Sequence, residues 1–260
     1  MRFGFIDFET TGLDAMIDEI IEVGITMVNF GDLSMPGQVT DIYGGFRDTD
    51  VPISIDAAEV HHITEEDIRG KVLPMDYIHS LLDGTDYCVA HNAPFDYQMA
   101  AQSDDLSWLT DLPWLDSLRH IDWVEHGHKT RTLNYIAADM GFINPFAHRA
   151  AMDTLTNVRV VEGCMEEMIE TSKQEIVTIK AYKTQFSPSL TAILKSMGFR
   201  WYPKDSLDDK HWWVETTPAK AREFYEGGLR QVYDVEWKFK ANLKYSSITW
   251  EEYLKNYKTV

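Results

Sequence analysis

Phe5-Ile6-Asp7-Phe8-Glu9-Thr10-Thr11-Gly12, close to the start of this 260-residue chain, combines an apolar strand pattern with two carboxylates. The apolar run from Arg2 to Phe8 predicts a short central β-strand, and the turn residues after Glu9 end it. Asp7 and Glu9 are two positions apart, so a strand places both side chains on the same face of its sheet. Neighbouring carboxylates repel each other and lose hydration, and a bound cation offsets that cost.

Two later segments also carry acidic residues beside predicted elements. In Ala90-His91-Asn92-Ala93-Pro94-Phe95-Asp96 a strand ends and Pro94, which lacks an N–H, suits the first turn of a helix. In His148-Arg149-Ala150-Ala151-Met152-Asp153 a loop histidine precedes a helix. We expect one folded site that binds Mg²⁺ or Mn²⁺ and has the form of a two-metal, phosphodiester-cleaving centre. The four carboxylates expected in it are Asp7, Glu9, Asp96 and Asp153.

Each segment alone has a simpler interpretation. An Asp-x-Glu pair at a strand edge is usually solvated, and Asn92 and Asp96 can act as helix-capping residues. His148 gains meaning from the carboxylates, because a loop histidine beside a metal site can take the proton from an attacking water. The three segments together, on compatible elements, favour the catalytic interpretation.

The order of predicted elements favours an α/β fold over residues 1–175. Three strands come first and alternating helices and strands follow, which predicts a mixed five-stranded sheet flanked by helices. Thr64 and Asp67 form a capping-box pattern at one helix start. The expected strands cover 2–8, 19–30, 38–46, 87–90 and 112–115, and the expected helices cover 63–68, 74–82, 130–140, 149–170 and a segment opening at 94.

Charge divides the chain into two parts. The net charge is −18, yet residues 1–175 carry 10 Lys/Arg against 32 Asp/Glu, whereas residues 176–260 carry 14 against 10 and are net positive. A polar stretch over 171–184 predicts the boundary between them. An acidic body repels a phosphate backbone except at its metal site, so the basic part is the better candidate for gripping nucleic acid. Alternatively, the charge only keeps the body soluble.

Residues 176–260 predict a small α+β appendage with many aromatic side chains. They hold 16 of the 32 Phe, Trp and Tyr residues, so either stacking on bases or a compact small core explains them. A helix at 190–197, strands at 199–202 and 211–215, and a helix at 218–227 are expected. Candidate contact residues are Arg200, Trp201, Tyr202, Lys204, Lys210, Trp212 and Trp213, and in the tail Trp237, Lys238, Phe239, Lys240, Lys244, Trp250, Tyr253, Lys255 and Lys258.

The sequence predicts a cytoplasmic protein with no membrane partner. It has no apolar stretch of about 18 residues and no signal-peptide pattern. Cys88 and Cys164 lie in apolar contexts, which predicts reduced core thiols rather than a disulfide or a zinc pair. His126 and His128 lie in a polar loop, a pattern more typical of a surface than of a zinc site.

The three acidic segments together resemble the motifs of the DEDD superfamily, the proofreading-type 3′–5′ exonucleases with a ribonuclease-H-like fold. Asp7-Phe8-Glu9-Thr10-Thr11-Gly12 is similar to the first motif and His91-Asn92-Ala93-Pro94-Phe95-Asp96 to the second. His148 through Asp153 is similar to the third in its histidine variety, DEDDh. Val60-His61-His62-Ile63-Thr64 resembles a segment between the first two motifs, with His62 where the family often has glycine.

The resemblance implies a two-metal mechanism. The four carboxylates would hold two Mg²⁺ or Mn²⁺ ions roughly 4 Å apart, one activating the attacking water and the other stabilising the leaving 3′-oxygen. His148 would be the general base, and a 5′-mononucleotide would leave from the 3′ end. His91 is either an outer neighbour of the site or a buried structural histidine. The residues implied in substrate binding are Thr10, Thr11, Gly12, Leu13, His62 and Asn92.

We therefore expect a metal-dependent 3′–5′ exonuclease acting on single-stranded 3′ ends, with DNA favoured over RNA. A 3′–5′ exoribonuclease or oligoribonuclease is an alternative, because recognition of a 2′-hydroxyl depends on few contacts. A polymerase-associated or defence-related binding subunit is the alternative outside the enzymes. All five expected catalytic residues are present, which argues against an inactive scaffold. The C-terminal module would contact the strand, a polymerase or another protein.

Overall fold

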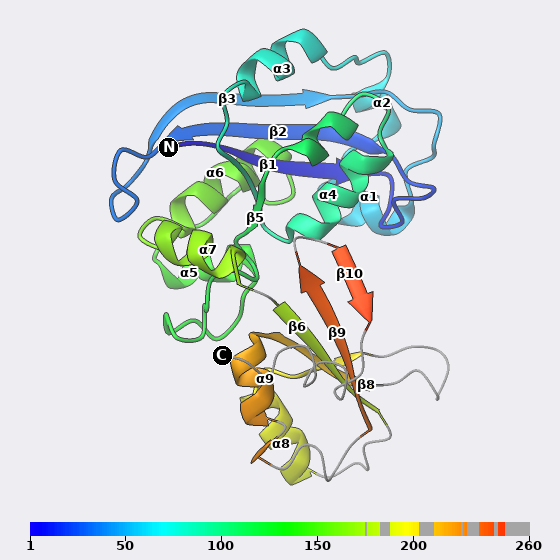
Figure 1. The fold of residues 1–260 in the computed structure, drawn as a ribbon. Helices are drawn as coiled ribbons and strands as arrows, with labels where there is room; N and C mark the ends of the chain where they lie inside the picture. Colours follow the sequence, from blue (N-terminus) through cyan, green and yellow to red (C-terminus); the bar gives the residue numbers. More distant parts are fainter. Residues whose placement is uncertain are drawn as a thin grey trace. The chain divides into compact units, whose positions relative to one another are not determined.

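The computed structural model describes residues 1–174, 176–182, 188–202, 211–224, 226–227, 234–241 and 244–247. The chain divides into two compact units, Met1–Ser172 and Lys173–Val260, and each has its own β-sheet (Figure 1). Some of the candidate contact residues lie outside the described residues. These are Lys204, Lys210, Trp250, Tyr253, Lys255 and Lys258.

The first unit is built on a mixed five-stranded sheet, which confirms the predicted fold class. Its strands lie in the order β3-β2-β1-β4-β5. The pairs β1–β2 and β2–β3 are antiparallel, whereas β1–β4 and β4–β5 are parallel. The central strand is therefore the one that carries Asp7 and Glu9. The strands are β1 (Arg2–Thr10), β2 (Ile20–Asn29), β3 (Gln38–Phe46), β4 (Tyr87–Ala90) and β5 (Trp114–Asp116).

Helices flank this sheet, as predicted (Figure 1). Thr64 and Asp67 make the two reciprocal bonds of the predicted capping box at the start of α2. Within the described residues the helices of this unit are α1 (Ile55–His61), α2 (Glu65–Ile68), α3 (Met75–Leu82), α4 (Ala93–Gln102), the 3₁₀ helix η1 (Ser107–Asp111), α5 (Leu133–Asp139), α6 (Ala150–Val160) and α7 (Met165–Ser172).

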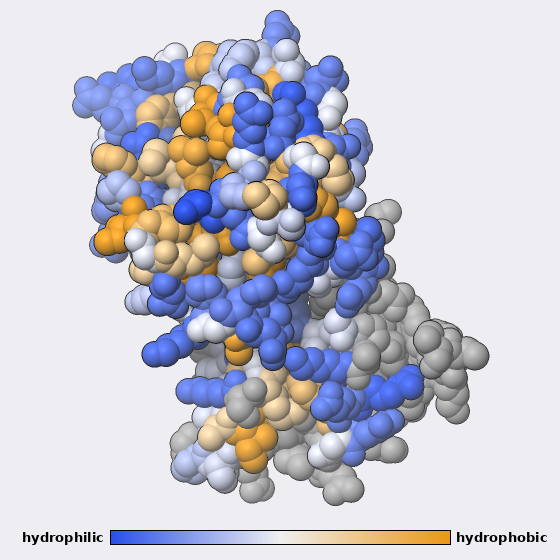
Figure 2. All heavy atoms as spheres, turned by 90° about the vertical axis from the view of Figure 1, so that its left-hand side faces the viewer, coloured by the Kyte–Doolittle hydropathy of each residue, from blue (hydrophilic) through white to orange (hydrophobic). Residues whose placement is uncertain are grey.

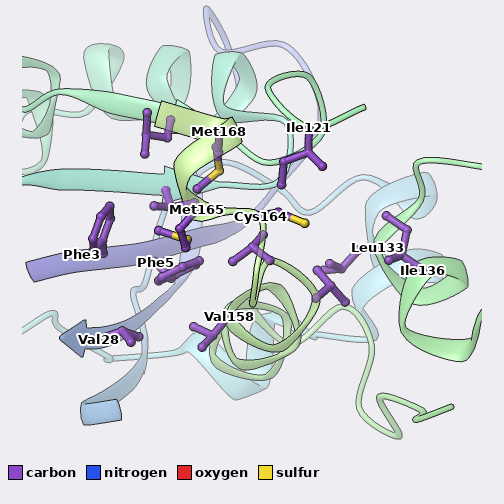
Figure 3. Close-up of a cluster of buried hydrophobic side chains, with 14 of the residues drawn as sticks. Phe3, Phe5, Val28, Ile121, Leu133, Ile136, Val158, Cys164, Met165 and Met168 are labelled. Atoms are coloured by element: carbon purple, nitrogen blue, oxygen red, sulfur yellow. The ribbon is translucent and has the colours of Figure 1, made fainter. Parts of the chain in front are cut away.

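Alternation along β1 divides the core into two layers. Phe3 and Phe5 belong to a cluster with residues of α5, α6 and α7, part of which Figure 3 shows. Ile6 and Phe8 belong to a second cluster with residues of α3 and α4. Burying each such side chain stabilises the fold by about 1.5–3 kcal/mol, so the two layers fix β1 between two groups of helices. The sheet face of Phe3 and Phe5 continues into Asp7 and Glu9 and is the face that α6 covers.

Two helix predictions differ from the structure. The helix predicted over 149–170 is two helices, α6 and α7, because the chain turns at Gly163, whose φ is +83°. Glycine tolerates this left-handed conformation, which other residues rarely adopt. Helix α1 has no clear sequence signal, because its seven residues span only about two turns and show little periodicity.

The second unit has an antiparallel sheet in the order β10-β9-β6-β8-β7, together with helices α8 and α9. The sheet is larger than the pair of strands expected, because β6 fills much of the stretch over 171–184 and the tail supplies β9 and β10. Trp212 is buried and packs against Trp201, which is 43% exposed. The elements are β6 (Ile176–Tyr182), α8 (Pro188–Ser196), β7 (Arg200–Tyr202), β8 (His211–Thr216), α9 (Pro218–Phe224), β9 (Asp234–Ala241) and β10 (Lys244–Ser247).

The surface of the described residues is mixed. In Figure 2, hydrophilic residues in blue surround smaller groups of hydrophobic residues in orange on one face of the molecule. Exposed large apolar side chains include Leu13, Met16 and Ile17, which follow β1 in the chain. Among the helices of the described segments, none combines the length and the apolar character that a membrane crossing needs.

Candidate metal-binding active site

The acidic site begins at the C-terminal half of β1. Asp7 lies opposite Gly24 of β2, and Glu9 lies opposite Glu22. Asp7 and Glu9 share a face with Phe3 and Phe5, so the same alternation that builds the apolar core turns two carboxylates toward α6. Both residues are partly buried. The strand thus supplies two oxygen ligands on one rigid element.

Asp153 reaches this place from the first turn of α6. It is buried, and its Oδ1 accepts a hydrogen bond from Asn144 Nδ2 at 2.9 Å while its Oδ2 accepts one from the Arg149 backbone N–H at 3.1 Å. One ligand atom each of Glu9, His148 and Asp153 lie within 4.8 Å of one another. His148 is exposed and has φ +63°, a left-handed turn directly before α6. These three residues are close enough to surround one cation.

Asp96 comes from the first turn of α4, beyond the C-terminal end of β4. It is only 3% exposed, and it is hydrogen-bonded to the backbone at Phe8 of β1. The charge of Asp96 is the largest electrostatic influence on Asp7, ahead of Glu9 and Asp153. The structure therefore brings the four carboxylates of three separated segments into one electrostatic cluster.

Burial and mutual repulsion favour the protonated form of these carboxyl groups and so raise their pKa values. Burial, followed by the charges of Asp96 and Glu9, raises the pKa of Asp7 well above its usual value. Burial, followed by the charge of Asp153, raises the pKa of Glu9 to about 8. Burial likewise raises the pKa of Asp96, and that of Asp153 to about 6. Such a cluster ionises fully only when cations replace the protons.

A buried ion pair beside this cluster is not predicted by the sequence motifs. Glu22 is 4% exposed, and the Arg149 guanidinium donates to it through Nη2 at 2.9 Å and through Nε at 3.2 Å. The Ala150 backbone N–H also points at Glu22, at 3.3 Å. The charge of Glu22 raises the pKa of Glu9, and that of Arg149 lowers it. Glu22, an acidic residue in an otherwise apolar strand, is the only local sign of this ion pair. Its partner Arg149 lies 127 positions away in the sequence.

A close backbone contact seats α6 on β2. A Cβ atom added at Gly24 would lie 2.2 Å from the carbonyl carbon of Ala150 and 2.4 Å from the backbone nitrogen of Ala151. A Cβ atom does not approach non-bonded backbone atoms this closely, so only glycine allows α6 to lie this near to β2. Because Asp153 and the His148 turn belong to the same end of α6, the contact helps to set their separation from β1.

The residues after Glu9 divide into buried and exposed members. Thr10 and Thr11 are buried, and their hydroxyls donate within the turn, Thr10 to the Gly12 carbonyl at 2.5 Å and Thr11 to Asp18 at 3.0 Å. The two threonine side chains therefore hold the loop. Leu13 is 87% exposed. It lines a cavity of about 430 Å³ whose other lining residues are Asp14, Ala15, Met16, Tyr97, Gln98, Ala101 and Gln102.

The remaining expected binding residues occupy special backbone positions. His62 is exposed at the C-cap of α1 with φ +58°, a conformation that favours glycine. Asn92 has φ +91° at the N-cap of α4 and donates its backbone N–H to Asp116 at 3.1 Å. Asp116 is a buried carboxylate that the sequence did not single out. His91 is partly buried, and its ring nitrogens are bonded to Ser117 Oγ at 2.9 Å and to the Arg131 carbonyl at 2.8 Å.

The family model described as Exonuclease (RNase_T) matches residues 5–161. The chain is 30% identical over 187 residues to the DNA polymerase III PolC-type of Thermotoga maritima, a match that covers 68% of this chain and 12% of that protein. The chain thus spans about an eighth of the length of that relative.

Solved structures with the same fold include two of exonuclease I from E. coli. The complex with a dT13 oligonucleotide matches with a TM-score of 0.57 at 13% identity, covering 88% of this chain and 70% of the other. The zinc-bound complex with single-stranded DNA matches with a TM-score of 0.55 at 14% identity, covering 88% and 67%. At these identities the likeness concerns the fold. The family model, however, spans most of the chain and contains all five expected catalytic residues, and the chain accordingly belongs to the exonuclease (RNase_T) family of enzymes.

Proposed function

We propose that this enzyme is a metal-dependent 3′–5′ exonuclease that releases 5′-mononucleotides from single-stranded 3′ ends, with DNA favoured over RNA. The observation that carries the proposal is the convergence of Asp7, Glu9, Asp96 and Asp153 in one cluster with raised pKa values. A protein gains nothing in stability from such repulsion, so a cation-dependent function is the natural explanation.

The donor set fits hard divalent cations. Carboxylate oxygens of Asp7, Glu9, Asp96 and Asp153 are the ligands that Mg²⁺ and Mn²⁺ prefer, and they come from a strand and two helices that the core holds in place. Two such ions, when bound, would supply Lewis acid activation of water and charge stabilisation at the departing 3′-oxygen.

The remaining groups have distinct tasks in this proposal. His148 is exposed beside Glu9 and Asp153, where its imidazole can accept a proton from the attacking water and pass it to solvent. Arg149 is a positioning residue, because its pair with Glu22 holds the chain next to His148. Leu13, at the rim of the cavity beside α4, would pack against the terminal base.

The substrate choice rests on the similarity to a polymerase. The similar region of the Thermotoga maritima relative belongs to a DNA polymerase, which favours DNA as the substrate and a polymerase as a partner. An exoribonuclease is the alternative outcome, because few contacts separate DNA from RNA.

A digestion assay tests the proposal. Single-stranded DNA and RNA of the same sequence, labelled at the 5′ end, are incubated with the full chain and Mg²⁺ or Mn²⁺. We expect a ladder that shortens from the 3′ end, faster for DNA, and no shortening in chelator. Asp7→Asn should lower the rate about 10³-fold or more, because metal ligation contributes several kcal/mol to transition-state stabilisation.

Asp41→Asn is the matched control, because Asp41 is an exposed aspartate on β3 of the same sheet. It should digest at the wild-type rate. The proposal fails if neither strand is shortened, or if Asp7→Asn acts like the wild type. Faster digestion of RNA would instead identify an exoribonuclease.

For the second unit we propose a contact with the strand or with a partner protein. Its net positive charge and the exposure of Trp201 support this role. Trp201→Ala should weaken binding of single-stranded DNA without changing the salt dependence, since it removes stacking and no charge. Unchanged binding would leave partner contact as the role of this face.

A further inference from the structure

A second group of metal-ligating side chains lies outside the acidic site, where the loop over 122–128 meets the start of α7. His126 Nε2 lies 2.6 Å from Glu167 Oε2 and 3.9 Å from Cys164 Sγ. One ligand atom of each of the three residues lies within 4.8 Å of the other two. We propose that His126, Cys164 and Glu167 bind a zinc ion that clips this loop to α7.

The geometry suits a tetrahedral ion. Zinc binds thiolate sulfur at about 2.3 Å and imidazole nitrogen or carboxylate oxygen at about 2.0–2.2 Å, which places neighbouring ligand atoms about 3.5 Å apart. The separations of 2.6 and 3.9 Å lie on either side of this value. Small side-chain rotations therefore suffice. The His126 side chain is 40% exposed, so a water molecule can fill the fourth position.

The surroundings hold the ligands in place. Glu167 Oε1, the oxygen not facing His126, accepts a hydrogen bond from the Asp122 backbone N–H at 2.7 Å. Cys164 belongs to the buried cluster of Figure 3 and precedes α7 directly. The Trp123 ring lies 6.3 Å from the His126 ring, and its Nε1 donates to the Ser117 carbonyl at 2.7 Å. Outer contacts of this kind orient metal ligands.

The donor atoms also determine which ion fits. Thiolate and imidazole favour zinc and similar transition ions, whereas Mg²⁺ prefers oxygen. A thiolate, a carboxylate and a neutral imidazole carry two negative charges, which one divalent ion balances. The thiol proton leaves when the ion binds. The proposed site therefore differs in chemical class from the acidic cluster of Asp7 and Glu9.

A clip here would stabilise the connection between β5 and α5. That connection contains Trp123 and His126 and continues to Arg131, whose carbonyl is bonded to His91 Nε2 at 2.8 Å. His91 lies next to Asn92 at the N-cap of α4, the helix that carries Asp96. The zinc would thus have a structural role in the first unit.

Zinc binding to the full chain tests this proposal directly. The measurements use Asp7→Asn/Asp153→Asn protein, in which the acidic site is weakened, with Mg²⁺ in excess. We expect one Zn²⁺ per chain after dialysis, and a rise in Tm of roughly 5–10 °C at a free Zn²⁺ concentration of about 100 times Kd. Adding His126→Gln should weaken Zn²⁺ binding by at least about 100-fold and abolish the Tm rise.

His128→Gln is the matched control, because His128 lies in the same loop but faces Asp139 at 3.3 Å. It should retain full Zn²⁺ binding. Replacement of Zn²⁺ by Co²⁺ should add a thiolate-to-cobalt absorption band, which Cys164→Ser removes. If Cys164→Ser fails to fold, the His126→Gln titration and the Co²⁺ band of the unsubstituted cluster still decide. Equal Zn²⁺ binding with and without His126→Gln, or a Co²⁺ spectrum without a thiolate band, would overturn the proposal and leave an ordinary His–Glu ion pair.

Discussion

The acidic cluster and the His126–Cys164–Glu167 cluster gather ligand residues in different ways. The acidic cluster takes its groups from β1, α4 and α6, which the core holds rigidly, and it carries strong repulsion. The second cluster joins a loop to the start of α7 and contains an opposite-charge pair when His126 is protonated. The proposed catalytic site thus places its ligands on rigid elements at an energetic cost, whereas the proposed zinc site lies where a loop meets a helix.

The largest effect that separates the two clusters should come from their histidines. His148→Ala should lower kcat about 10²–10⁴-fold, because it removes the proposed general base, and should leave Tm nearly unchanged since the side chain is exposed. His126→Gln should keep the wild-type kcat in Mg²⁺. Digestion rates and melting curves of both variants check this. Similar losses of kcat in both variants would contradict a catalytic role for one cluster and a purely structural role for the other.

The next effect concerns how the acidic site is held. Glu22→Gln leaves the Arg149 guanidinium without its carboxylate partner. The free energy of unfolding should fall by about 1.5–3 kcal/mol, and Tm should fall with it. The kcat should fall about 10–100-fold, because His148 is then misplaced. KM should change less than kcat.

Glu19→Gln provides the control for Glu22. Glu19 pairs with Arg47 at 3.5 Å, and its side chain is 42% exposed. Loss of this ion pair should lower the free energy of unfolding by at most about 1 kcal/mol and leave kcat unchanged. Equal effects of the two substitutions on kcat would remove the positioning role of Arg149.

The third comparison concerns the pH dependence of stability rather than activity. The pKa of Glu9 is raised from 4.5 to about 8, and that of Asp153 from 3.8 to about 6, so the folded chain holds protons that the unfolded chain has released. Stability without metal should therefore fall as pH rises from about 3.8 to about 8. Each pKa unit corresponds to about 1.4 kcal/mol, or about 3–5 °C in Tm.

Mg²⁺ should reverse this trend, because it binds the ionised carboxylates and not the protonated ones. Melting curves across this pH range, in chelator and in Mg²⁺, check the expectation. The second cluster should show no such response to Mg²⁺. A Tm that does not change with pH in chelator would contradict the proposed repulsion among the carboxylates of the acidic cluster.

Much of the first unit follows from local pattern. The bounds of β3 and β4 and the capping box of Thr64 and Asp67 agree with the sequence prediction, because strand alternation and capping depend on neighbouring residues. The sequence also predicts that the three acidic segments form one site, and their convergence needs only the parallel pairing of β1 and β4 and the packing of α6.

What the sequence could not give depends on distant partners. β6 has the β-branched sequence IVTIKAY between polar flanking residues, and its pairing with β8 and β9 places it at the centre of a sheet. The Glu22–Arg149 pair and the His126–Glu167 pair join residues 127 and 41 positions apart, and no local pattern encodes such contacts. His126 is exposed and Cys164 is a buried free thiol, as their local sequence contexts predict, but no local pattern predicts that both lie beside Glu167.

The contact of Gly24 with Ala150 and Ala151 makes the width of the acidic site a property of the main chain. A side chain at position 24 would lift the start of α6 away from β2, because no flexible group is there to yield. The enzyme could then keep its sheet and its cores while the carboxylates of β1 and α6 move out of each other's reach. The geometry of the proposed metal site therefore depends on a residue that contributes no ligand atom.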